Sequence, residues 1–396
     1  MAGRKPVVGV LGAGAMGAGI AQIAALRGHT VVLADAQSSA CDSARDRIIK
    51  SLAREVEKKR LQHADVDEAL ERLLLTHLDS THGYDAFGAC DMVIEAIVEQ
   101  LDAKRTAFRQ LEAAVQDDCI LASNTSSLSI AAIAAACERP QRALGVHFFN
   151  PATVMPLVEI VPGVRTDAAV VATARGIVDG WGKTTVLALD TPGFIVNRVA
   201  RPYYGEALRI LDEGLATISD IDWSMTTLGG FRMGPFELMD FIGHDVNYVV
   251  TESVWTALYY DPRFKPSLTQ RRLLEAGLLG KKSGRGFYDY ANGAERPAAR
   301  EDRALGDRVF NRILAMLVNE AIDAVYHRIT TVADIEVAMT KGMNYPKGLL
   351  AWGEEIGLDK VLDEIDRLHD EYHEDRYRAS ALLRRMVRER KSLFSE

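Results

Sequence analysis

Residues 8–21 read VGVLGAGAMGAGIA, and this stretch decides the fold. The apolar run over residues 7–11 does not alternate with polar residues, which is typical of a parallel strand buried on both faces. The pattern Gly12-x-Gly14-x-x-Gly17 then opens a helical stretch that ends at Gly28. This order predicts a dinucleotide site, in which Gly12 makes the tight turn, Gly14 admits the pyrophosphate and Gly17 lets helix and strand pack closely.

Asp35 follows the next apolar run, residues 30–33, and stands eighteen positions after Gly17. An acid at the end of the second strand binds the adenosine ribose hydroxyls and repels a 2′-phosphate. The expected cofactor is therefore NAD rather than NADP. The alternative is a glycine-rich turn that binds nothing.

Short apolar runs continue to alternate with helical stretches. The runs cover residues 92–94, 120–122, 144–146, 158–161 and 185–189, and two of the helical stretches cover residues 38–59 and 66–74. Alternating strands and helices predict an α/β fold with a doubly wound parallel sheet. Strand signals stop at Thr191-Pro192-Gly193, so we expect a first domain, residues 1–190, to end near Asp190.

The second half of the sequence repeats itself at a fixed offset. Its residues Asn197, Arg198, Glu206, Asp220, Ile221, Asp222, Met225, Gly234, Gly243 and Asp245 are matched, 114 positions later, by Asn311, Arg312, Glu320, Asp334, Ile335, Glu336, Met339, Gly348, Gly357 and Asp359. This ordered repetition predicts two copies of one helical unit, over residues 191–290 and 301–396. The expected architecture is a Rossmann-type domain followed by two all-helical units.

Charge and composition exclude several classes of function. A net charge of −8 and a pI near 5.7 argue against nucleic acid as a partner. The cysteines show neither a C-x-x-C pair nor metal-ligand spacing, which favours reduced thiols in a cytoplasmic protein and no metal site. No apolar run reaches the roughly 18 residues of a membrane span. The glycines of the nucleotide motif also interrupt the apolar N-terminal stretch, which argues against a signal peptide.

His147 follows the run at residues 144–146, at the carboxyl edge where open α/β sheets bind ligands. A lone histidine there is more often structural. Glu159, twelve residues later, changes this interpretation, because a returning strand would let its carboxylate hold the imidazole as a general acid or base.

Two neutral polar residues are further candidates. Ser126, in the phrase SNTSSL, has no nearby base to make it a nucleophile, so we interpret it as a hydrogen-bond donor. The alternative is a helix N-cap. Asn197 lies early in a helix after Pro192-Gly193. Asparagine is an indifferent helix former, so a functional polar role and a hydrogen bond at a domain interface are equal alternatives.

Seven phrases together carry a specific resemblance that covers residues 7–290. They are GAGAMGAGIA, VIEAIVEQLDAK, ASNTSSL, GVHFFNP, DTPGFIVNR, MGPFELMD and GKKSGRGFYDY. With them the sequence closely resembles the (S)-3-hydroxyacyl-CoA dehydrogenases, especially bacterial 3-hydroxybutyryl-CoA and 3-hydroxyadipyl-CoA enzymes. Residues 304–394 resemble a second C-terminal unit that some members carry.

The resemblance implies a role for each matched position. His147 is the general base, Glu159 its partner, and Ser126 and Asn197 bind the substrate oxygen. The implied cofactor contacts, besides the glycines and Asp35, are Glu99, Lys104, Ser126, Asn150 and Lys282. Lys58 matches a coenzyme A contact; a second family lysine has no clear match, and Arg54 or Arg60 would compensate.

The resemblance implies reversible NAD-dependent oxidation of a (S)-3-hydroxyacyl-CoA, with 3-hydroxybutyryl-CoA as the first expectation. The acyl chain is expected near Met225, Leu228, Gly229, Gly230, Phe231 and Met233, with room left by the two glycines. The alternative is 3-hydroxyadipyl-CoA, for which Arg232 is the cation in that phrase. Two rivals are a dehydrogenase of a free hydroxy acid and a non-catalytic NAD-binding protein.

A further expectation concerns assembly. Single-copy members pair their helical domains between subunits, so the second copy is expected to pack on the first within one chain. A homodimer is the other possibility.

Overall fold

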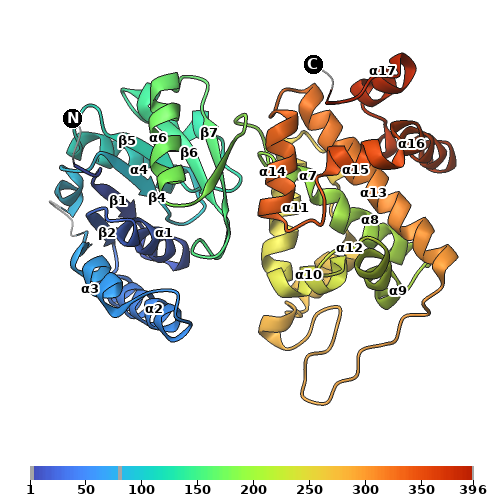
Figure 1. The fold of residues 1–396 in the computed structure, drawn as a ribbon, viewed down its shortest axis with the longest axis horizontal. Helices are drawn as coiled ribbons and strands as arrows, with labels where there is room; N and C mark the ends of the chain where they lie inside the picture. The colour runs from blue at the N-terminus through green and yellow to red at the C-terminus, as the bar shows by residue number, and fades with distance from the viewer. Residues whose placement is uncertain (1–3, 79–82, 395–396) are drawn as a thin grey trace. The chain divides into compact units, whose positions relative to one another are not determined.

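The computed structural model describes residues 4–78 and 83–394, and the chain divides into two compact units, Met1–Thr191 and Pro192–Glu396 (Figure 1). Strands of the first unit are β1 (Val8–Leu11), β2 (Val31–Asp35), β3 (Leu73–His77), β4 (Met92–Glu95), β5 (Ile120–Ser123), β6 (Ala143–Phe148), β7 (Leu157–Pro162) and β8 (Thr184–Leu187). Its helices are α1 (Ala15–Leu26), α2 (Ser38–Glu57), α3 (His63–Glu71), α4 (Leu101–Ala114), α5 (Ile130–Ala134) and α6 (Ala168–Gly180).

In the described residues the strands form one eight-stranded sheet, in the order β3-β2-β1-β4-β5-β6-β7-β8. Strand β1 lies between β2 and β4 and is parallel to both, so the strand order reverses there. Ligands of open α/β sheets bind at the carboxyl ends of the strands beside such a reversal. The topology therefore puts the Gly12–Gly17 turn, which follows β1, at the expected ligand edge.

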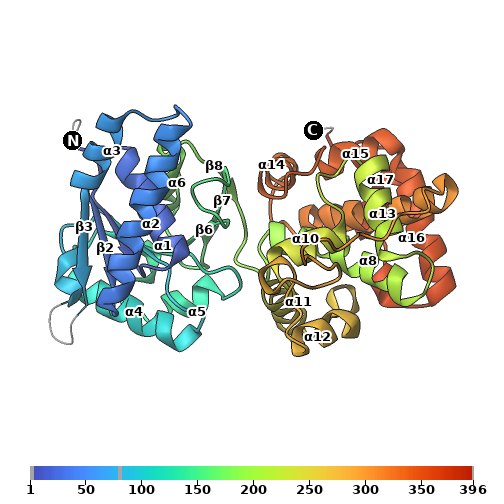
Figure 2. The same ribbon diagram turned by 90° about the horizontal axis from the view of Figure 1, so that it is seen from below.

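Helices cover both faces of the sheet, with a hydrophobic core under each layer (Figure 2). On one face α1, α2, α3 and α6 bury residues such as Ile20, Ile48 and Val178 against the strands. On the other face α4 and α5 bury Phe108 and Ile133. The prediction of a doubly wound α/β sheet is confirmed.

Two details differ from the sequence-based expectation. Residues 66–74 were expected to be one helix, but α3 ends at Glu71 and Leu73 begins β3, which pairs with β2. An unbroken leucine run at residues 73–75 fits a helix and an edge strand equally well, so the periodicity did not separate them.

The other difference is that β7 runs antiparallel to β6. Eight residues, 149–156, join the two strands, and a parallel crossover needs a dozen or more. The chain therefore returns directly, which brings the facing residues of β6 and β7 into register.

Asp190, near the end of the first unit, is hydrogen-bonded to the start of α5. Its carboxylate accepts hydrogen bonds from the backbone nitrogens of Ile130 (2.9 Å) and Ala131 (2.8 Å) at the start of α5. The chain is thus anchored through Asp190, and the second unit starts at Pro192.

The regular structure in the described part of the second unit is helical, apart from isolated β-bridges that pair Arg285 with Gly280 and Asp289. Its helices are α7 (Val196–Val199), α8 (Arg201–Asp212), α9 (Ile218–Trp223), α10 (Pro235–Ile242), α11 (His244–Ala257), α12 (Leu268–Glu275), α13 (Arg303–Tyr326), α14 (Val332–Gly342), α15 (Leu349–Ile356), α16 (Leu358–Tyr372) and α17 (Ala381–Glu389), with a π-helical turn, η3 (Ser224–Leu228), after α9.

Elements of this unit correspond at the offset seen in the sequence. Helices α10 and α15 begin and end 114 positions apart. Asp222 accepts hydrogen bonds from the first backbone nitrogens of α10, and Glu336 does the same for α15. A duplicated unit would produce this match; the division into copies of residues 191–290 and 301–396 stays a prediction.

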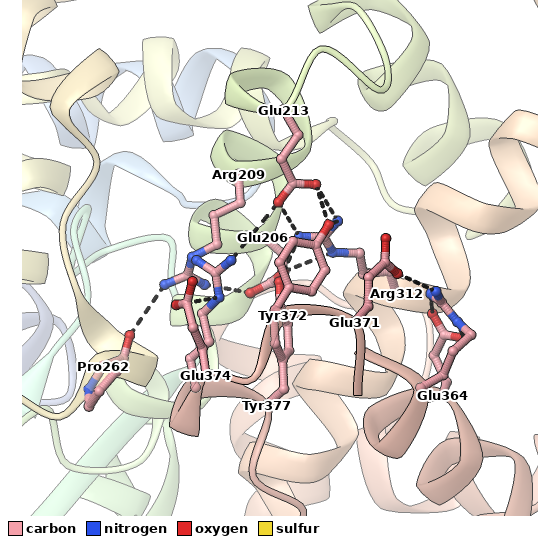
Figure 3. Close-up of polar contacts among 12 residues, drawn as sticks. Glu206, Arg209, Glu213, Pro262, Arg312, Glu364, Glu371, Tyr372, Glu374 and Tyr377 are labelled. Carbon is pink, nitrogen blue, oxygen red and sulfur yellow. Dashed lines mark hydrogen bonds and ion pairs between the residues drawn. The ribbon is translucent and has the colours of Figure 1, made fainter. Parts of the chain in front are cut away.

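A network of arginines, carboxylates and tyrosines, buried at Arg312, Glu206 and Tyr377, joins α8 to α13 and the C-terminal segment (Figure 3). Arg312, 3% exposed, donates to Glu206 through Nε (3.0 Å) and to Glu213 through both terminal nitrogens (2.7 and 2.9 Å). Tyr372 and Tyr377 accept from the same guanidinium. The charges in this core are thus compensated at close range.

Candidate active site

Each of the three glycines of the first loop, Gly12, Gly14 and Gly17, is needed for a different structural reason. Gly12 has φ +106°, and a Cβ there would lie 2.6 Å from the carbonyl oxygen of Ala96. A Cβ on Gly17 would lie 1.8 Å from the carbonyl oxygen of Gly12. Gly14, however, has no atom within 4 Å of a Cβ position. The fold requires Gly12 and Gly17, whereas Gly14 leaves open space at the N-terminus of α1, as an approaching pyrophosphate needs.

Asp35 ends β2 and braces the same loop. One carboxylate oxygen accepts from the backbone nitrogen of Ala13 (2.8 Å) and the other from that of Gln37 (2.9 Å). The group is half-buried and anionic at the place where an adenosine ribose would lie. Together with the space at Gly14, these residues fit NAD.

His147 and Glu159 face each other across the antiparallel β6–β7 pair. Nδ1 of His147 lies 2.7 Å from Oε2 of Glu159, with the histidine 5% and the glutamate 0% exposed. A carboxylate on Nδ1 fixes the tautomer, so that Nε2 becomes the ring atom able to take a proton. The buried pair has the geometry of a general base and its orienting partner.

The SNTSSL loop is tied to this pair through the backbone. Asn124 accepts a hydrogen bond from the backbone nitrogen of Phe148 (2.8 Å), and the ring of Phe149 lies 4.5 Å from that of His147. The loop that carries Ser126 and the strand that carries His147 are therefore held together inside the first unit.

Glu99 organises the loop itself. Its Oε1 accepts from the hydroxyl of Thr125 (2.6 Å) and the backbone nitrogen of Ser126 (2.9 Å), whereas the hydroxyl of Ser126 is 3.4 Å away. Burial alone would raise the pKa of Glu99, but Lys104 and these donors lower it, so the carboxylate stays ionised. The long Ser126 contact is weak enough to be exchanged for a ligand.

Lys104 is enclosed rather than exposed at the ligand edge. It is 1% exposed, and its ammonium lies 2.7 Å from Glu95 and 3.2 Å from Glu99. Ser123 also donates to Glu95, at 2.6 Å. Sequence reasoning missed Glu95 and Ser123; the signal was an acid ending the buried strand MVIE. Lys104 thus contacts Glu95 and Glu99, and its expected role toward the cofactor stays a prediction.

The other predicted residues are spread more widely. Lys58 follows α2, is exposed, and pairs with Glu55 at 3.0 Å, as does Arg60 at 3.2 Å. Arg54 is exposed in the last turn of α2, and Asn150 is exposed just after β6. The first unit therefore brings His147 and Glu159 into contact and, through Asn124, holds the loop that carries Ser126 against their strand.

Asn197 and Lys282 belong to the helical unit. Asn197 lies in α7 and is partly exposed, and Lys282 pairs with Asp245 at 2.6 Å. Their expected roles toward the ligand stay predictions.

The expected acyl region is more tightly packed than the sequence suggested. Phe231 is buried, with its ring 4.9 Å from those of Tyr203 and Tyr345. A Cβ on Gly229 would lie 2.7 Å from the carbonyl oxygen of Met225. Gly229 is therefore required by packing, whereas a Cβ on Gly230 would meet only the Cβ of Pro346, at 3.8 Å. The placement of the acyl chain here stays a prediction. Arg232 is exposed.

Metal-ligand groupings, cysteines and long apolar helices were the other features to consider in the described residues. Residues 4–78 and 83–394 contain no grouping of three or more histidine, cysteine, aspartate or glutamate side chains suited to a metal ion. The four cysteines are free and buried, and burial raises the pKa of Cys90, Cys119 and Cys137 to about 12. Within the same residues, no helix has the length and hydrophobicity needed to span a membrane.

Comparison with protein families gives two matches. The model described as 3-hydroxyacyl-CoA dehydrogenase, NAD binding domain, matches residues 7–191. The model of the C-terminal domain of the same enzymes matches residues 193–290 and 309–392.

Individual relatives agree with these matches. The chain is 37% identical to a 3-hydroxyadipyl-CoA dehydrogenase of Escherichia coli K12, over 95% of this chain and 96% of the relative. It is 40% identical to a 3-hydroxybutyryl-CoA dehydrogenase of Bradyrhizobium diazoefficiens, over 72% of this chain and 94% of that one. Among solved structures, a 3-hydroxybutyryl-CoA dehydrogenase from E. coli K12 superposes with a TM-score of 0.90 at 36% identity, covering 97% of this chain and 98% of the other.

Proposed function

The chain belongs to the 3-hydroxyacyl-CoA dehydrogenase family, and from this we propose how its own residues carry out the NAD-dependent, reversible oxidation of a (S)-3-hydroxyacyl-CoA to a 3-ketoacyl-CoA. The observation that carries the proposal is the buried His147–Glu159 pair, at 2.7 Å, beside the serine loop. A general base held by a carboxylate next to a dinucleotide fold is what hydroxyl oxidation requires.

His147 takes the proton of the 3-hydroxyl group. Glu159 holds Nδ1, so neutral His147 presents Nε2 to the substrate and becomes an imidazolium when the proton arrives. The adjacent carboxylate stabilises that imidazolium as it forms. In the reverse direction the same His147 is the acid that protonates the oxygen of the ketone.

Ser126 and Asn197 donate hydrogen bonds to the substrate oxygen. Both are neutral donors, so they stabilise the negative charge that develops on that oxygen without neutralising His147. The 3.4 Å contact between the Ser126 hydroxyl and Glu99 is the one exchanged when the substrate arrives.

Cofactor binding is assigned to the ligand edge of the first unit and to one lysine of the second. Bound NAD supplies the acceptor for the hydrogen of C3 as a hydride. The residues assigned to hold it are Gly12, Gly14, Gly17, Asp35, Glu99, Lys104, Ser126, Asn150 and Lys282. Lys104 contributes by keeping Glu99 ionised and in place. Lys58 is assigned to coenzyme A, whose phosphates also suit the neighbouring Arg54 and Arg60.

Two rivals are separated by one assay. The purified protein is mixed with NAD and either 3-hydroxybutyryl-CoA or free 3-hydroxybutyrate, and NADH is followed by its absorbance. We expect turnover of the thioester alone. Turnover of the free acid alone would identify a hydroxy-acid dehydrogenase, and no turnover with any thioester or with the free acid would identify a non-catalytic NAD-binding protein.

Assembly and location follow as part of the proposal. The second helical copy supplies within one chain the packing surface that two subunits supply elsewhere, and the buried Arg312 network supports this. We assign the protein to the cytoplasm from its unpaired, buried cysteines.

A further inference from the structure

Arg201 is a buried arginine without an acidic partner. It is 7% exposed, at the start of α8. One terminal nitrogen donates to the hydroxyl of Thr251 (3.0 Å) and approaches the carbonyl oxygen of Asn247 (3.5 Å), and Nε has no hydrogen-bond partner. Among residues 4–78 and 83–394, no carboxylate lies within ion-pair distance of it. The guanidinium is therefore an uncompensated charge.

Other buried arginines of the same unit show what is usual here. Arg198, Arg263 and Arg312 are 3–8% exposed, and each binds at least one carboxylate. An ionised group without such a partner is expensive to bury, and arginine does not escape by losing its proton. Burial lowers the pKa of Arg201, and only the tyrosines Tyr204 and Tyr345 oppose this.

The surroundings of Arg201 suit an anion. Its guanidinium lies over the ring of Tyr204, 4.9 Å from the centroid. The hydroxyl of Tyr345 is buried and has no hydrogen-bond partner, and it lies close enough to Arg201 for each to shift the pKa of the other. Two unsatisfied donors, Nε of Arg201 and the Tyr345 hydroxyl, thus occur in one region. A carboxylate accepts several hydrogen bonds and would satisfy both.

The internal repeat shows that the fold does not need these polar residues. At the matching positions of the second copy, Arg201 is replaced by Ala315, Asn247 by Val361 and Thr251 by Ile365. All three replacements are buried and apolar. The polar set therefore occurs only in the copy that also carries Asn197.

The second copy has a hollow at the positions that correspond to Asn197, Arg201 and Asn247. Asn311, Ala315 and Val361, the counterparts of Asn197, Arg201 and Asn247, line a hollow of about 300 Å³ between α13 and α16. In the first copy, the corresponding helices, α7–α8 and α11, carry Arg201 where the second copy has Ala315. In the second copy, a hollow thus adjoins Asn311, the asparagine that corresponds to Asn197.

The spacing of Asn197 and Arg201 matches a particular substrate. They are four residues apart, joined through Ala200, which has helical backbone angles, so their Cβ atoms are separated by about 5–6 Å on one face. In a six-carbon dicarboxylic chain, three carbon–carbon bonds of about 1.5 Å join C3 to the terminal carboxyl carbon. If Asn197 binds the oxygen on C3 of the substrate, the terminal carboxylate therefore lies within reach of the Arg201 side chain, one helical turn later.

We propose that Arg201 binds the terminal carboxylate of the substrate, and that the enzyme prefers a 3-hydroxyacyl-CoA ending in a carboxylate at C6. This deepens the proposed function and rests on the assignment of Asn197 to the 3-oxygen. It moves the recognition of the carboxylate from Arg232, which is exposed, to Arg201.

The test compares kcat/KM for the C6 dicarboxylic ester, its C6 monocarboxylic analogue 3-hydroxyhexanoyl-CoA, and 3-hydroxybutyryl-CoA. In the unmodified enzyme we expect the dicarboxylic ester to be best. In Arg201→Met its advantage over the hexanoyl ester should fall by about 10–100-fold, the usual range for a lost charged hydrogen bond. Arg201→Lys should restore part of that ratio, and Arg232→Ala should leave the ratio unchanged.

Each contrary result has a distinct meaning. If no thioester is turned over, the proposed function fails. If thioesters are turned over without preference for the dicarboxylic one, or if Arg201→Met lowers both C6 esters equally, or if the preference disappears in Arg232→Ala, only the role of Arg201 is wrong.

A second measurement needs no variant, in case Arg201→Met does not fold. Adipyl-CoA and hexanoyl-CoA lack the 3-hydroxyl group and compete for the site of the unmodified enzyme. We expect adipyl-CoA to inhibit 3-hydroxybutyryl-CoA oxidation at a concentration at least about tenfold lower. Equal inhibition constants would overturn the proposal.

Discussion

Arg198 and Glu320 form a buried ion pair, Nε to Oε1 at 2.8 Å, and 114 positions away from each, Arg312 and Glu206 form its counterpart at 3.0 Å. Each copy thus gives its arginine to the glutamate of the other. Such reciprocity is the mark of a two-fold related interface, which here lies within one chain.

Removing Arg312 should destabilise the helical unit strongly. Arg312→Met leaves Glu206 with Arg209 as its remaining arginine partner and Glu213 without its bidentate one. Breaking a buried pair from one side costs about 3–5 kcal/mol. Arg303→Met, on the same helix, breaks an exposed pair with Asp307 and should lower the free energy of unfolding far less. Urea unfolding followed by tryptophan fluorescence measures both, and equal losses would contradict the buried role.

The same network should make stability depend on pH. Burial raises the pKa of Glu206, but Arg209 and Arg312 outweigh it and hold the pKa below its ordinary value of 4.5. A carboxylate with a depressed folded pKa stabilises the native state above about pH 4.5 and loses this contribution as the pH falls through the folded pKa. The urea midpoint should therefore fall on acidification, and less steeply in Glu206→Gln than in the unmodified protein. Identical slopes would exclude Glu206 as a contributor.

His147 should be essential for the chemical step but not for cofactor binding. We expect His147→Gln to lower kcat by roughly 10²–10⁴-fold, the usual share of general acid–base catalysis. The dissociation constant of NADH, measured by fluorescence, should change little, since the glycine loop is untouched. Near-normal turnover in this variant would remove the mechanism.

Gly14 and Gly17 should respond differently to alanine. Gly14→Ala meets open space and ordinary backbone angles, so the protein should fold normally yet bind NAD at least about tenfold more weakly. Gly17→Ala places a Cβ 1.8 Å from a carbonyl oxygen and should cost about 1–3 kcal/mol or more. Thermal unfolding with and without NAD separates the two effects. Unchanged NAD affinity in Gly14→Ala would show that the pyrophosphate lies elsewhere.

Asp35 should set the choice of cofactor. The unmodified enzyme should strongly prefer NAD, and Asp35→Ser should raise the use of NADP by removing the repelled charge while keeping an acceptor for Ala13. The ratio of kcat/KM for the two cofactors is the readout. Equal use of both by the unmodified enzyme would be inconsistent with this role.

Local patterns predicted the first unit well, because the glycine turn, its strand and Asp35 lie within one short segment. The facing of His147 and Glu159 followed from a returning strand, whose antiparallel direction the expected parallel sheet did not include. That direction depended on the length of one loop. The start of β3 was misread because leucine runs suit both helix and strand.

Contacts between residues far apart in the chain could not be predicted from the sequence. The enclosure of Lys104 by Glu95 and Glu99 depends on how β4, α4 and the following loop pack. Arg201 is notable for the partner it lacks, and only coordinates reveal a missing contact. Arg232 drew attention through proximity in the sequence, which did not indicate that its side chain is exposed.

Because the two helical copies are joined covalently, the packing between them does not depend on the concentration of the protein. An interface between separate subunits weakens as concentration falls, because association is bimolecular. Here residues 291–300 link the two helical copies, so the chain itself fixes the local concentration of one copy near the other. The packing that supports Asn197 and Arg201 therefore persists at any abundance of the enzyme, even when few molecules are present in a cell.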